Sequence, residues 1–129
     1  MVVAAPRRAR AAPLAVAALA IAAGAALYVR DPRTSTYLPC PFHALTGLWC
    51  PGCGATRAFG DLVRGDLVSA ASSNVLAVLL LGVGVVAWGL WVRGRRSRAP
   101  SRWVVVSGVA IVLAFTVLRN LSAGSWLAP

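Results

Sequence analysis

Three long apolar runs, separated by polar segments, set the pattern of this chain. No charged residue falls within residues 11–29, 67–92 or 103–118. A helix rises about 1.5 Å per residue, so runs of this length cross, or nearly cross, a hydrocarbon core of roughly 30 Å. The pattern therefore predicts transmembrane helices over residues 11–29, 67–92 and 103–120.

The segment between the first two helices, residues 30–66, is polar. Asp31, Pro32 and Pro39 predict a loop at its start. Its last part, residues 55–64, separates apolar from charged side chains on a helix. The apolar face holds Phe59, Leu62 and Val63, and the opposite face holds Arg57, Asp61 and Arg64. This predicts a short helix at the membrane interface, or a connecting helix with a solvated polar face.

Composition supports lipid as the solvent for most of the chain. Of the 129 residues, 59% are hydrophobic and only 12% are charged, and the mean hydropathy is +0.76. A chain this short has no interior large enough for so much apolar surface. The predicted fold class is an all-α membrane protein with three transmembrane helices, a short interfacial helix, and a cysteine-rich loop between helices 1 and 2.

The start of the chain permits a second interpretation. A basic beginning, an apolar centre and small residues before Leu27 are also features of a cleaved signal peptide. The run stays apolar as far as Tyr28, which favours a retained helix. The remaining segments are a basic tail, a basic loop and a C-terminal tail, at residues 1–10, 93–102 and 121–129.

Charge predicts the orientation. The net charge of +10 comes from thirteen arginines and three aspartates, with no lysine or glutamate. Three arginines precede the first helix, five lie in residues 93–102, and four lie in residues 30–66. Because arginines accumulate on the cytoplasmic side, we expect a cytoplasmic N-terminus and an extracytoplasmic cysteine loop in the cell membrane. Arginines placed beside apolar runs argue against a nucleic-acid partner.

All three cysteines and the only histidine lie in residues 40–53. In Cys50-Pro51-Gly52-Cys53, proline followed by glycine predicts a type II turn, with a positive φ at Gly52, that brings two sulfurs to one side. Ten residues earlier, the sequence Cys-Pro-Phe-His repeats the pattern and ends on histidine. Three thiolates and one imidazole are the ligand set of a closed zinc site. The predicted zinc ligands are Cys40, His43, Cys50 and Cys53.

Two other interpretations of the cysteines stay open. A plain Cys50–Cys53 or Cys40–Cys50 disulfide would brace an extracytoplasmic loop. Alternatively, the cysteines are redox-active thiols, since Cys53 lies just before a predicted helix start, where the helix dipole lowers a thiol pKa. No phosphate loop, serine nucleophile elbow or helical His-Glu zinc motif is present. The sequence therefore indicates no catalytic set.

Three polar residues are expected to support the cysteine loop. Arg57 would lower the pKa values of the thiols. Arg119 and Asn120 end the third apolar run, and we expect them to reach the loop and either cap its carbonyls or pair with Asp61. The alternative is that Arg119 only extends toward the interface.

The stretch Cys-Pro-Phe-His-Ala-Leu-Thr-Gly-Leu-Trp-Cys-Pro-Gly-Cys-Gly-Ala-Thr-Arg, with Asn74 and a terminal Leu-Arg-Asn, resembles the small bacterial membrane proteins catalogued as domain of unknown function 2752 (DUF2752). The resemblance spans roughly residues 28–121 and implies a bacterial, multi-span membrane protein with no assigned activity. Its core motif adds Thr46, Gly47 and Gly54 to the residues expected to support the site.

Two functions follow as hypotheses. In the first, the chain is a binding or assembly module whose braced loop docks another membrane or envelope protein. In the second, it exchanges electrons or disulfides with an envelope partner through Cys50 and Cys53. Transport is disfavoured because no span holds a clearly buried acid or base.

Overall fold

The computed structural model describes residues 7–34, 40–95, 99–122 and 124, and within these ranges the regular structure is entirely helical. The helices are α1 (Arg7–Val29), α2 (Pro41–Thr46), α3 (Ala55–Val63), α4 (Leu67–Val92) and α5 (Arg102–Asn120). Three of them are long and apolar enough to cross a membrane, over Ala11–Val29, Leu67–Val92 and Arg102–Asn120. The predicted all-α fold class with three membrane-spanning helices is confirmed.

Two boundaries differ from the expected organisation. Helix α1 begins at Arg7, inside the predicted basic tail, and continues through Pro13. The segment after Cys40, expected to form a turn, is instead the short helix α2. Proline explains this start, because its fixed φ suits the first turn of a helix, where no backbone N–H is needed.

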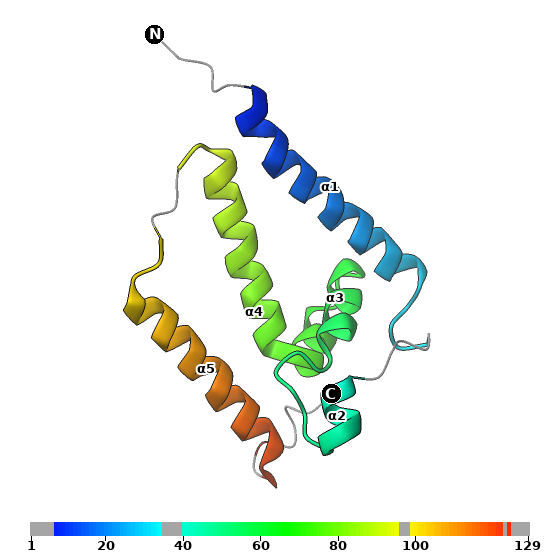
Figure 1. The fold of residues 1–129 in the computed structure, drawn as a ribbon. Helices are drawn as coiled ribbons and strands as arrows, with labels where there is room; N and C mark the ends of the chain where they lie inside the picture. Colours follow the sequence, from blue (N-terminus) through cyan, green and yellow to red (C-terminus); the bar gives the residue numbers. More distant parts are fainter. Residues whose placement is uncertain (1–6, 35–39, 96–98, 123, 125–129) are drawn as a thin grey trace.

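The packed core is small and lies where α3 contacts both α1 and α4 (Figure 1). Its helix contacts use small residues: Ala58, Ala70 and Ala77 are buried. Gly60 of α3 leaves room for the ring of Pro32 in the loop after α1, since a Cβ atom there would lie 2.8 Å from that ring. Such small residues let backbones come together where lipid supplies no hydrophobic driving force.

Of the three charged residues on the polar face of α3, Asp61 turns into the protein while Arg57 and Arg64 are exposed, so the prediction of a solvated polar face is wrong for Asp61. Asp61 is only 6% exposed. Arg33 donates to both of its carboxylate oxygens, from Nε at 2.9 Å and from Nη2 at 2.7 Å. Ser73 of α4 donates to the same carboxylate at 3.3 Å. These bonds join the loop after α1 to α3 and α4.

Helix α1 is a packed part of this core. Arg64, at the end of α3, donates to the carbonyls of Leu27 and Tyr28 at 3.1 and 2.8 Å. Near the N-terminal end of α1, the Pro13 carbonyl accepts a hydrogen bond from the Trp88 indole of α4 at 3.0 Å. These bonds join α1 to α3 and α4.

Helix α5 is attached differently. The C-terminal ends of α1 and α5 and the N-terminal end of α4 point toward the end of the molecule that holds α2 and α3 (Figure 1). Among the described helices, α5 packs extensively against none. Its contacts with the rest of the fold concentrate in its last turn, at Arg119 and Asn120.

Candidate metal centre

Helix α2 positions the first cysteine and then reverses the chain. Cys40 is the residue before the helix, and its carbonyl accepts from the Ala44 N–H at 2.9 Å. Gly47, at φ +71°, ends the helix and donates to the His43 carbonyl at 2.8 Å. The Thr46 hydroxyl donates to the Phe42 carbonyl at 2.6 Å. Thr46 and Gly47 therefore terminate α2 and return the chain toward the other two cysteines.

The second cysteine pair lies on a tight turn, but the turn is not the predicted type II. The Cys53 N–H donates to the Cys50 carbonyl at 3.1 Å, which closes the turn. Positive φ occurs at Gly54 (+82°) and not at Gly52. Gly54 therefore supplies the left-handed residue, because it must redirect the chain from this turn into α3.

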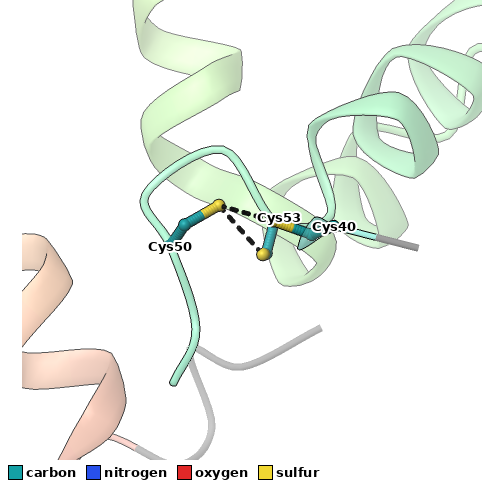
Figure 2. Close-up of side chains that lie close together, drawn as sticks. All are labelled: Cys40, Cys50 and Cys53. Carbon is teal, nitrogen blue, oxygen red and sulfur yellow. Dashed lines mark hydrogen bonds between the residues drawn. The ribbon is translucent and has the colours of Figure 1, made fainter. Parts of the chain in front are cut away.

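The three sulfurs converge. The Cys50 Sγ lies 3.5 Å from the Cys40 Sγ and 3.0 Å from the Cys53 Sγ (Figure 2). All three ligand atoms fall within 4.8 Å of one another, and none of the three is in a disulfide. In a tetrahedral zinc site, bonds of about 2.3 Å place two sulfurs about 3.8 Å apart. The three cysteines are thus close enough to hold a metal ion.

The local surroundings separate the pKa values of these thiols. The pKa of Cys40 is lowered to about 7, chiefly because the His43 backbone N–H favours its thiolate, with further help from the Cys50 and Cys53 side chains. The pKa of Cys53 is raised to about 12, chiefly by burial. Burial thus opposes ionisation of Cys53, so a thiolate at that position needs a positive charge among the sulfurs.

His43 lies outside this group of converging ligand atoms. Its ring stacks on Trp49, with centroids 3.9 Å apart and planes inclined by 15°. Its Nδ1 lies 3.2 Å from the Leu48 carbonyl oxygen. The turn expected at residues 40–43 is replaced by α2. His43 therefore lies within this helix, whereas Cys40 precedes it. Its role as fourth ligand stays a prediction.

Arg119 reaches the cysteine turn from the end of α5, where it is 1% exposed. Its Nη1 donates to the Cys50 carbonyl at 3.0 Å, and both Nη atoms donate to the Cys53 carbonyl at 3.3 Å. Of the predicted contacts, carbonyl capping is therefore present, while Asp61 pairs with Arg33 instead. The Arg119 side chain is therefore buried against the cysteine turn.

Asn120 holds the residue before the turn. Its Oδ1 accepts from the Trp49 N–H at 2.8 Å, and its Nδ2 donates to the Trp49 carbonyl at 2.8 Å. The backbone N–H and the carbonyl of Trp49 are therefore both hydrogen-bonded to the Asn120 side chain. The expected contact between Asn120 and the cysteine loop is present.

Asn74 of α4 is a supporting residue that the sequence analysis did not assign to the site. It is 1% exposed, and its Nδ2 donates to the Pro51 carbonyl at 2.8 Å and the Cys53 carbonyl at 3.0 Å. Its backbone is not helical, at φ −165° and ψ 92°, and its Oδ1 caps the Ala77 N–H at 2.9 Å. The signal in the sequence was an amide side chain inside an apolar run.

Every carbonyl from Trp49 to Cys53 accepts a hydrogen bond from the protein, since the Gly52 carbonyl accepts from the Ala55 N–H at 3.0 Å. The turn is therefore fixed by groups from α3, α4 and α5. Arg57 is exposed on α3, and the effect on thiol pKa proposed for it stays a prediction.

The fold and this cluster define a class: a helical protein with membrane-spanning segments and three converging cysteines between its first two long helices. The family described as protein of unknown function (DUF2752) matches residues 40–88. The match confirms the resemblance over the cysteine loop, α3 and most of α4. No curated protein and no solved structure matches the chain.

Proposed function

We propose that this chain is a small bacterial membrane protein that works as a binding or assembly module, with a metal-braced cysteine loop that docks another membrane or envelope protein. The observation that carries the proposal is the convergence of three thiols on a turn whose carbonyls are all held. Exposed apolar side chains next to this turn, Phe42, Leu45 and Leu48, support a docking role.

The metal we propose is zinc, held by the thiolates of Cys40, Cys50 and Cys53, with His43 as fourth ligand. Zinc favours sulfur and nitrogen ligands in tetrahedral geometry. The contact of His43 Nδ1 with a backbone carbonyl favours the tautomer that leaves Nε2 free for a metal. A site closed by four protein ligands has no position for substrate, so the zinc would be structural.

We further propose that the cysteine loop is extracytoplasmic and the N-terminus cytoplasmic. The support is the distribution of arginines, eight on the cytoplasmic flanks against four in residues 30–66. The fold is compatible with this arrangement, because α2 and α3 gather at one end of the long helices (Figure 1).

A second candidate function is envelope thiol–disulfide exchange through Cys50 and Cys53, whose sulfurs are 3.0 Å apart. In that reaction a disulfide of a partner protein would accept two electrons. Cys50 and Cys53 would form one disulfide, and their two protons would pass to the partner's two thiols. One thiolate of this pair would attack the partner's disulfide and release one partner thiol, and the second cysteine of the pair would then displace the other partner sulfur.

Zinc and thiol analysis of the full-length protein, purified in detergent without reductant, separates these functions. The proposal expects about one zinc per chain and three titratable thiols after denaturation. Sub-stoichiometric zinc together with a Cys50–Cys53 disulfide would contradict the metal site and support exchange or a bracing disulfide.

Variants then assign the ligands. Cys40→Ser, Cys50→Ser and Cys53→Ser should each lose most of the zinc, whereas His43→Ala should lose less, because water replaces an imidazole more easily than a thiolate. Ser72→Ala is the matched control and should keep full zinc content, because Ser72 is exposed on α4 and its hydroxyl donates to the Ser69 carbonyl of the same helix.

A further inference from the structure

Arg119 carries a buried charge that no carboxylate of the described residues offsets. It is 1% exposed, and its hydrogen bonds go to the carbonyls of Cys50 and Cys53. Its Nε has no acceptor among the described residues. Carbonyls satisfy N–H groups but do not neutralise the charge, and an uncompensated charge in a dry site is costly.

The three aspartates of the chain are engaged elsewhere. Asp61 binds Arg33, Asp31 lies 3.7 Å from Arg64, and Asp66 accepts from the Ser69 N–H at 2.9 Å. Among the residues that the structure describes, the groups next to Arg119 that can become negative are therefore the thiols of the cysteine cluster, since its guanidinium binds the backbone of two of the three cysteines.

The charges of the cluster indicate which cation would leave it neutral. Three thiolates carry three negative charges, and a divalent cation among them offsets two. One negative charge remains, and Arg119 supplies one positive charge. A neutral imidazole or a water as fourth ligand leaves this balance unchanged.

We propose that Arg119 is the counter-charge of a three-thiolate site for a divalent, sulfur-preferring cation. The inference rests on the proposed metal site and assigns Arg119 a role beyond holding the turn. Asn74 provides the comparison within the chain, because it binds the Cys53 carbonyl as well but carries no charge. Asn74 positions the turn, whereas Arg119 positions it and also stabilises the metal-bound thiolates.

The affinity of purified full-length protein for Zn²⁺, measured by competition with a chromophoric chelator, tests this. Arg119→Gln keeps an N–H donor without the charge and should lower the affinity roughly 10–100-fold, as changes around metal ligands do. Arg119→Lys keeps the charge and should remain nearer to the unchanged protein than to Arg119→Gln. Equal loss in both variants would overturn the proposal, because hydrogen bonding alone would then explain Arg119.

A second pair of variants covers the case in which Arg119→Gln fails to fold. The Arg119 guanidinium lies over the Phe115 ring, 5.0 Å from its centroid and one helical turn away. Phe115→Glu places a carboxylate beside Arg119 and offsets its charge without removing it, whereas Phe115→Gln is the uncharged match. Phe115→Glu should bind Zn²⁺ more weakly than Phe115→Gln, and equal affinity would contradict the proposal.

Arg64→Gln is the control for loss of an arginine that also binds backbone carbonyls, those of Gly60 and Tyr28. It lies outside the cysteine turn and should leave Zn²⁺ affinity unchanged. The two levels of proposal fail separately. If the unchanged protein binds no Zn²⁺, the metal site itself is wrong. If it binds Zn²⁺ and the Arg119 and Phe115 variants bind as tightly, only the counter-charge is wrong.

Discussion

At the scale of single residues, the site depends on polar side chains placed near the ends of apolar helices. Asn74, Arg119 and Asn120 come from two helices, and each donates to a carbonyl of the cysteine turn or of Trp49. A buried carbonyl without a partner costs about 1–3 kcal/mol. These three residues therefore keep the turn in one conformation in surroundings that offer it few other donors.

Asn74→Ala should destabilise the fold by about 1–3 kcal/mol, because it removes donors to two carbonyls and the cap at the start of the α4 segment that follows the kink. The free energy of unfolding in detergent, measured with a denaturant, is the test. Ser72→Ala, on the exposed side of the same helix, is the control and should change little. If both variants unfold alike, the assignment of Asn74 to the turn is wrong.

At the scale of elements, α3 and α5 are held by different means. Helix α3 is joined to its neighbours by the packing of the Pro32 ring against Gly60 and by the Asp61–Arg33–Ser73 bonds. Helix α5 is held at one end, through the cysteine loop. Its orientation therefore depends on that loop more than on helix packing.

The Asp61–Arg33 pair predicts acid sensitivity. Hydrogen bonding to Arg33 lowers the pKa of Asp61 below its ordinary 3.8. The pair therefore stabilises the fold at pH values above about 4, and this contribution is lost as the pH falls further through the lowered pKa. The melting temperature of the protein, followed from pH 7 downward, should decrease below about pH 4.

Asp61→Asn is the control for that measurement. It should lower the melting temperature at neutral pH and reduce the additional loss in acid, since the titrating carboxylate is gone. An acid-induced decrease of the same size in Asp61→Asn would assign the effect to other groups.

The attachment of α5 predicts a local effect of Asn120→Ala. Loss of both bonds to Trp49 should increase hydrogen–deuterium exchange at Trp49 and in the last turn of α5, while exchange in α1 and α3 stays unchanged. Ser107→Ala, at an exposed position of the same helix, is the matched control. Exchange that rises equally across all helices would mean that α5 is held by something other than its last turn.

At the scale of the whole molecule, three apolar helices carry one small polar centre at one end (Figure 1). Most of their side chains face outward and are exposed in the isolated chain, as is expected of surfaces that contact lipid. The packed interior is confined to α3 and its neighbours and to the cysteine turn.

The orientation of this arrangement leads to a topology prediction. A membrane-impermeant thiol reagent, applied to whole cells after reduction and chelation, should label Cys40 and Cys50, which are both partly exposed. The reason is the excess of arginines on the opposite flanks. Cys40→Ser/Cys50→Ser protein, which keeps the buried Cys53, is the control for background. Labelling only after cell lysis would reverse the orientation.

The apolar runs by themselves determined the membrane helices, because transfer of a helix into lipid depends on its own composition and length. The spacing of the cysteines likewise indicated a shared site. The tertiary structure alone decided how that site is built: the positive φ at Gly54, the kink at Asn74, and His43 outside the group of sulfurs. Arg119 and Cys53 are 66 residues apart in the sequence. Whether a charged residue at a helix end is solvated or buried depends on such distant partners, and a local sequence pattern does not contain this information.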